Sequence, residues 1–87
     1  MLRLEWKELA RDDLNQIIEH IADDNPDAAA TLADDIEAKA ARLPEHPELY
    51  RVGRKKGTRE MVVHPNYIVI YQVQKTVVEI LRVKHAA

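Results

Sequence analysis

The sequence predicts a single α+β domain in which a two-helix hairpin packs on one face of a mainly antiparallel sheet. Three observations lead to this prediction. A short alternating segment opens the chain, two apolar stripes at helical spacing follow, and three runs rich in β-branched and aromatic residues fill the last third. With 87 residues the chain is large enough for one hydrophobic core and too small for two, so we expect residues 1–87 to form one domain.

The first half of the chain carries the patterns of one strand and two helices. Apolar and charged side chains alternate over residues 2–6, which predicts a short, half-buried strand. The apolar stripe that follows predicts a first helix from about Lys7 to about Asp23. Asn25, with proline and aspartate after it, predicts the start of a second helix, which ends where Pro44 prevents its continuation. Because the connection between the helices is so short, we expect an antiparallel hairpin.

The second half of the chain predicts four strands. We expect an edge strand at residues 49–52, followed by strands at about 58–64, 67–73 and 77–84, with turn residues between them. Residues 67–71 are apolar on both faces of a strand, which places this segment in the middle of the sheet. The predicted order is therefore strand, helix, helix and four strands, with the sheet face opposite the helices partly open.

Composition excludes several kinds of site. The chain has no cysteine, so it has neither disulfides nor thiolate metal ligands, and the spacing of its four histidines resembles no zinc site. We expect no cofactor and no metal. No apolar run approaches the roughly 20 residues that span a bilayer, and the N-terminal residues lack the apolar core of a signal peptide. We therefore expect a cytoplasmic protein.

The formal net charge is only -2, but the charges are divided unevenly along the chain. Acidic residues outnumber basic ones up to residue 48, and from residue 49 on the basic residues face only Glu60 and Glu79. Such asymmetry bears on partners and encounter rates more than on the fold. The basic residues of this second part are Arg51, Arg54, Lys55, Lys56, Arg59, Lys75, Arg82 and Lys84.

A basic cluster around the expected turn at residues 54–57 is the first candidate site. Side chains of this kind suit phosphate oxygens or an acidic protein segment, and a solvated turn is the alternative interpretation. The cluster consists of Arg51, Arg54, Lys55, Lys56 and Arg59.

Two arginines, Arg59 and Arg82, stand alone among apolar strand residues and need an anionic or hydrogen-bonding partner. The partner is either a ligand or a nearby carboxylate, for which Glu60 and Glu79 are available. The strand period of two places Arg59 on the face of Met61 and Val63. The same period places Arg82 on the face of Val78 and Ile80, and the sequence does not reveal which face is open.

Among the histidines, His85 and His64 are candidates for acid–base chemistry near neutral pH. His64 precedes Pro65 at a turn, which favours a structural role. His20 and His46 are isolated and are interpreted as solvated.

Two segments of the last third resemble the RelE/ParE superfamily of toxins from type II toxin–antitoxin systems. They are Gly-Thr-Arg-Glu-Met-Val-Val-His-Pro-Asn-Tyr-Ile-Val-Ile-Tyr-Gln-Val at 57–73 and Glu-Ile-Leu-Arg-Val-Lys-His at 79–85. The resemblance extends over essentially the whole chain. It implies the element order β-α-α-β-β-β-β and a bacterial growth inhibitor neutralised by a cognate antitoxin that is encoded beside it.

The resemblance implies one of two targets. RelE-like members are metal-independent endoribonucleases that enter the ribosome and cleave mRNA, and Arg59 and Arg82 match the positions of their two strand arginines. Lys55 or Lys56 would stand for their loop lysines, and His85 would be a catalytic acid or base. ParE-like members have no established ribonuclease activity and poison DNA gyrase.

Two departures from the RelE-like pattern favour the ParE-like function. The sequence ends in His-Ala-Ala without the tyrosine that cleaving members commonly carry, and its slightly negative charge is unlike that of a protein that docks on ribosomal RNA. A ribosome-dependent mRNA interferase remains the alternative, and a non-toxic relative that only binds an antitoxin is the third. In the ParE-like case the residues expected to bind the target are Arg51, Arg54, Lys55, Lys56, Arg59, Arg82 and Lys84.

Overall fold

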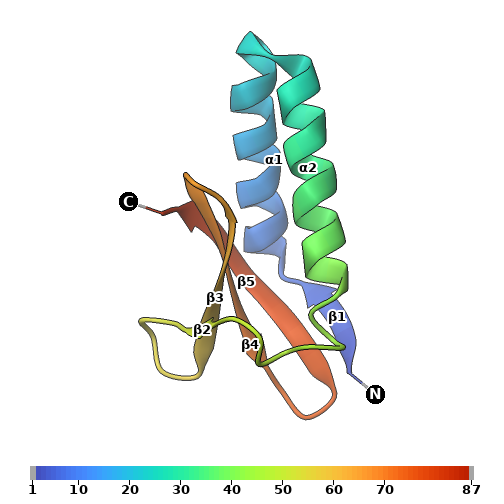
Figure 1. The fold of residues 1–87 in the computed structure, drawn as a ribbon, viewed down its shortest axis with the longest axis vertical. Coiled ribbons are helices and arrows are strands. Elements are labelled where there is room, and N and C mark those ends of the chain that lie inside the picture. Colours follow the sequence, from blue (N-terminus) through green and yellow to red (C-terminus); the bar gives the residue numbers. More distant parts are fainter. Residues whose placement is uncertain (1, 87) are drawn as a thin grey trace.

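A computed structural model of the chain describes residues 2–86, and it has the predicted α+β architecture (Figure 1). Five strands form one sheet in the order β1-β5-β4-β3-β2, and β4 lies at its centre as predicted. All pairs are antiparallel except β1 and β5, which run parallel. The elements in chain order are β1 (Arg3–Trp6), α1 (Glu8–Asp24), α2 (Pro26–Ala41), β2 (Arg51–Val52), β3 (Thr58–His64), β4 (Tyr67–Val73) and β5 (Val77–His85).

The two helices form the expected antiparallel hairpin, and a single residue separates them. The backbone N–H of Asn25 donates to Ile21 O over 2.8 Å and so ends α1. The Asn25 side chain accepts the N–H of Ala28 at 3.0 Å, and Pro26 opens α2 at a position where a missing N–H costs nothing. Figure 1 shows that the tip of this hairpin extends beyond the sheet.

The hydrophobic core lies between the helical hairpin and one face of the sheet. Small residues such as Ala10 and Ala40 are fully buried, which lets the helices approach the strands closely. Tyr71, at 0% exposure, is the largest fully buried side chain. The core consists of Ala10, Leu14, Leu32, Ile36, Ala40, Leu43, Met61, Val63, Tyr67, Val69, Tyr71, Val78, Ile80 and Val83.

An irregularity in β5 changes the face on which Arg82 lies. Tyr71 pairs with Ile80, but the preceding residue Ile70 pairs with Arg82, so Leu81 is an extra residue on β5. A bulge of this kind shifts every later side chain to the other face. The prediction that Arg82 shares a face with Val78 and Ile80 is therefore wrong, because strict alternation ends at Leu81.

The face of Arg59 is as predicted. Arg59 pairs with Tyr71 across β3 and β4, and Met61 pairs with Val69, so all of these residues are on the helix-covered face. Arg59 and Arg82 consequently lie on opposite faces of the sheet.

The loop between α2 and β2 is fixed to the sheet by two hydrogen bonds from buried or half-buried side chains. Tyr71 Oη donates to Pro47 O at 2.8 Å, and Arg59 Nη1 donates to Tyr50 O at 2.8 Å. Burial raises the pKa of the Tyr71 hydroxyl above its usual 10.0, so the group remains a neutral donor. These bonds hold residues 47–50 over the end of the core.

Within residues 2–86, neither helix combines the length and the apolar character needed to cross a membrane. The cytoplasmic location stays a prediction.

Replacing Tyr71 with phenylalanine is expected to destabilise the protein by about 1 kcal/mol, because the Pro47 carbonyl loses its donor in a buried setting. For a domain of this size the melting temperature should fall by about 4–8 °C. Thermal unfolding followed by circular dichroism measures the change. Tyr67→Phe is the matched control, since the Tyr67 hydroxyl makes no hydrogen bond within the described residues. An equal loss in both variants would contradict the assignment of the Tyr71 bond.

Candidate functional site

The sheet face opposite the helices carries a groove of about 890 Å³, which we call the open-face groove. Three parts of the chain enclose it: the start of α1, the loop between β2 and β3, and the strands β3, β4 and β5. The lining residues are Lys7, Glu8, Leu9, Arg54, Lys55, Thr58, Glu60, Ile68, Ile70, Leu81, Arg82, Lys84 and His85.

The open-face groove has an apolar floor and a basic border. Ile68, Ile70 and Leu81 form the floor, and the side chain of Leu9 at its edge is 60% exposed. Arg54, Lys55 and Lys84 line the border, and their side chains make no ion pair within residues 2–86. Of the predicted site residues, the structure therefore brings Arg54, Lys55, Arg82, Lys84 and His85 together.

A network of hydrogen bonds shapes the basic loop that borders the groove. Glu60, only 6% exposed, accepts a hydrogen bond from Arg51 Nε at 3.2 Å and one from the Arg54 N–H at 3.3 Å, and its Oε1 lies 2.9 Å from Arg51 Nη2 in an ion pair. Thr58 Oγ1 donates to Lys55 O at 2.6 Å. Gly53 packs so closely on Thr58 that a Cβ there would collide with its hydroxyl. These contacts hold the backbone of the loop in place, while the side chains of Arg54, Lys55 and Lys56 are exposed.

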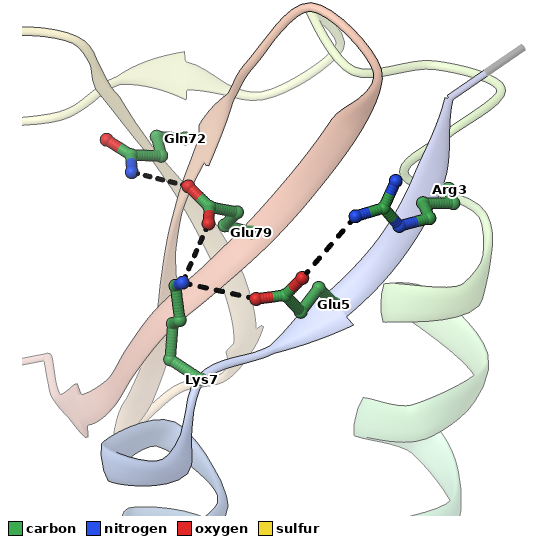
Figure 2. A network of polar contacts seen from close by, with 5 residues as sticks. All are labelled: Arg3, Glu5, Lys7, Gln72 and Glu79. Carbon is green, nitrogen blue, oxygen red and sulfur yellow. Dashed lines mark hydrogen bonds and ion pairs between the residues drawn. The ribbon is translucent and has the colours of Figure 1, made fainter.

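Lys7 joins two carboxylates at the opposite side of the groove (Figure 2). Its Nζ lies 2.8 Å from Glu79 Oε2 and 3.1 Å from Glu5 Oε1, and Gln72 Nε2 donates to Glu79 Oε1 at 2.7 Å. Glu5 and Glu79 pair directly across β1 and β5, so Lys7 separates two like charges. The bond to Lys7 lowers the pKa of Glu79, and the bond to Glu79 raises the pKa of Lys7.

Arg82 forms a bidentate ion pair with Asp13 of α1. Arg82 Nε lies 2.7 Å from Asp13 Oδ2, and Nη2 lies 2.9 Å from Oδ1. The Val83 N–H donates to the same Oδ2 at 3.0 Å. The bond from Arg82 lowers the pKa of Asp13 below its usual 3.8, and Asp13 raises the pKa of Arg82.

Neither of the two carboxylates that the sequence makes available to the strand arginines binds one of them. Glu60 binds Arg51 rather than Arg59, and Glu79 binds Lys7 rather than Arg82. The guanidinium of Arg59 donates a hydrogen bond to the backbone carbonyl of Tyr50 on the covered face of the sheet.

Three further predicted residues lie outside the groove or at its margin. Lys56 is exposed and does not line the groove. His85 lies at the end of β5 with its ring 4.8 Å from that of Tyr67. His64 Nδ1 accepts the Asn66 N–H at 3.1 Å, which supports the structural role expected of this turn residue. No three of the described His, Asp and Glu side chains gather as metal ligands.

Sequence reasoning missed Lys7 and Asp13. Asp13 follows Ala10 by three residues and precedes Ile17 by four, so it lies at the flank of the apolar stripe of α1. An acidic residue beside the apolar stripe of a helix indicates a cationic partner on the sheet that the helix covers. Lys7 is found only once the parallel pairing of β1 and β5 is known.

The helical hairpin over a mixed sheet is the fold expected of the RelE/ParE superfamily of toxins, and comparison with known proteins confirms this family. The sequence matches the family described as the ParE toxin of type II toxin–antitoxin systems, parDE, over residues 4–87. The chain belongs to this family, and the protein is the toxin of a type II toxin–antitoxin system.

Relatives of known name cover nearly the whole chain. The chain is 40% identical to the protein Y4kP of Sinorhizobium fredii over 85 residues, which is 97% of this chain and 88% of the relative. It is 38% identical to Toxin RelE2 of Caulobacter vibrioides over 82 residues, which is 94% of this chain and 90% of the relative.

A solved structure from the chromosomal ParDE system of P. aeruginosa has the same fold. Its TM-score is 0.88 at 21% identity, and the match covers 100% of this chain and 98% of that chain. YafQ of E. coli matches with a TM-score of 0.71 at 15% identity over 99% of this chain and 94% of that one. At these identities the two structures confirm the fold alone.

The Asp13–Arg82 ion pair predicts a specific loss of stability in acid. A lowered pKa means that Asp13 stabilises the folded state fully above pH 3.8 and that this contribution is lost as the pH falls through the folded-state pKa. Asp13→Asn should therefore show a lower melting temperature at neutral pH and a shallower decline below pH 3.8. Melting temperatures measured from neutral pH to pH 2 test the difference.

Asp12→Asn is the matched control, because this substitution removes the same charge from α1 at an exposed residue. If both variants decline in acid as steeply as the unaltered protein, Asp13 does not contribute as the geometry indicates.

Proposed function

We propose that this toxin inhibits growth in the ParE manner, by binding DNA gyrase and stabilising its cleaved DNA complex without covalent chemistry of its own. The placement of the two strand arginines carries the proposal. A nuclease of the RelE type would need Arg59 and Arg82 to hold one scissile phosphate. Here Arg59 bonds the Tyr50 carbonyl on the covered face, and Arg82 is paired with Asp13 at the opposite face.

The charge of the open-face groove supports the same proposal. A protein that docks on ribosomal RNA normally carries a large positive excess, because each neutralised phosphate releases counterions. This chain has a net charge of -2, and Glu8 and Glu60 line the groove beside its cations. An apolar floor with an exposed Leu9 suits a protein surface better than a sugar–phosphate backbone.

A RelE-like mRNA interferase is the second candidate, and two observations favour it. One relative at 38% identity carries the name Toxin RelE2. The open-face groove also holds Lys55, Lys84 and His85, which are the types of residue that position a phosphate and move a proton. In this alternative these side chains, with Arg82 released from Asp13, would form the catalytic set.

Purified toxin incubated with gyrase and relaxed plasmid, and in parallel with ribosomes programmed with an mRNA, separates the candidates. We expect linear plasmid to accumulate while the mRNA stays intact. Cut mRNA with normal supercoiling would establish the interferase instead. Absence of both effects, together with normal growth on overexpression, would indicate a non-toxic relative that only binds an antitoxin.

We propose further that a cognate antitoxin covers the open-face groove. The groove offers an apolar strip between basic borders, which fits a segment that is disordered alone and carries acidic residues beside its apolar ones. Such a segment would bury Leu9 and neutralise Arg54, Lys55 and Lys84. The solved relative from P. aeruginosa is described as a ParDE toxin–antitoxin system, which supports the presence of such a partner.

Charge reversal at Lys55 is expected to slow association with the antitoxin and to weaken the salt dependence of the rate, because border charges act mainly on encounter. Stopped-flow or surface plasmon resonance at several salt concentrations measures both effects. Lys75→Glu is the matched control, since Lys75 lies in the β4–β5 turn and does not line the groove. Equal slowing by both variants would place the antitoxin elsewhere.

A further inference from the structure

Within residues 2–86, no strand pairs with the outer edge of the second half of β5. β1 pairs with β5 from Val77 to Ile80 only, and the chain then leaves the sheet to form α1. Past this point the backbone donor that faces outward at Val83 meets Asp13 rather than another strand. The carboxylate of Asp13 thus substitutes for a strand partner.

The same carboxylate also takes up the guanidinium of Arg82. Three donors converge on it: Arg82 Nε at 2.7 Å, Arg82 Nη2 at 2.9 Å and the Val83 N–H at 3.0 Å. The Asp13 side chain is 16% exposed and that of Arg82 is 39% exposed. Arg82 lines the open-face groove, and Asp13 holds it from α1 without lining the groove itself. The charge of Lys84 also acts on Asp13.

A fork of two guanidinium donors with a backbone amide beside it is a binding arrangement for phosphate as much as for carboxylate, because both anions present two oxygens at similar spacing. In this protein the anion that these donors bind is the carboxylate of Asp13. We infer that Asp13 is a specificity-determining residue, which holds Arg82 and the Val83 amide and so keeps the open-face groove from binding the phosphates of RNA.

The inference rests on the proposed function, in which RNA is not the target, but its test uses no gyrase and no ribosome. The probe is a short fluorescein-labelled single-stranded RNA, and its anisotropy is measured with Asp13→Asn, Asp12→Asn and the unaltered toxin at several salt concentrations. Asparagine keeps an oxygen for the Val83 amide and removes the charge. Thermal unfolding at neutral pH shows which variants are folded.

We expect Asp13→Asn to bind the RNA about tenfold more tightly at low salt and to steepen the plot of log K against log salt by about 0.7, the value for one added single-strand phosphate contact. Asp12→Asn makes the same change in net charge without releasing Arg82, so it should stay close to the unaltered toxin. Adding Arg82→Gln to Asp13→Asn should abolish the gain. Equal binding by the Asp13 and Asp12 variants would overturn the inference.

A measurement on the unaltered toxin decides the question even if Asp13→Asn does not fold. In NMR spectra the Arg82 Nε–H and Val83 N–H resonances should stay in place as the RNA is added. If both resonances shift, the RNA reaches these donors despite Asp13, and the inference is wrong. Cleavage of mRNA by the unaltered toxin would instead overturn the proposed function, and it is detected separately in the ribosome assay.

Discussion

The structure depends on the way β5 divides its two edges between different partners. β4 covers one edge along the whole strand, whereas β1 covers the other only as far as Ile80, where the Lys7 N–H still donates to Ile80 O at 2.9 Å. The chain leaves β1 at this residue, and α1 continues along the remainder of β5. Asp13 then accepts the Val83 N–H at the free edge of β5, while the next residue, Leu14, packs in the core. This single crossover places both helices on one face of the sheet and leaves the other face open.

Most of the fold could be predicted from the sequence because its signals are local. The bounds of β3 and β4 agree with the prediction, and the first helix is displaced by one residue at each end. Asn25 and Pro26 determine the helix junction by their own capping chemistry. The bulge at Leu81 could not be predicted, because leucine is an ordinary strand residue and nothing in its local sequence marks it as an extra one. It follows from the register of β5 against β4, where Ile70 pairs with Arg82 and Tyr71 pairs with Ile80, and no pattern within β5 itself indicates that register.

The same distinction separates the predictable part of the candidate site from the rest. Arg54 and Lys55 are adjacent in sequence, so their common position needs no knowledge of the fold. The partner of Arg82 lies 69 residues earlier, on a helix whose packing decides the contact. Glu60 and Glu79 are the carboxylates that the sequence makes available to the two arginines, yet each of them binds a different cation.

The distribution of charge across the open-face groove indicates what kind of ligand it suits. Arg54 and Lys55 precede β3 and Lys84 lies on β5, so the basic borders run on either side of the apolar residues of β4. Asp13 neutralises Arg82, which lines the groove, and buried Glu60 neutralises Arg51 beside it. A phosphate backbone would meet few available cations and a floor that offers it no donors. An apolar segment flanked by acidic side chains would satisfy both the floor and the borders, as the proposed protein partner requires.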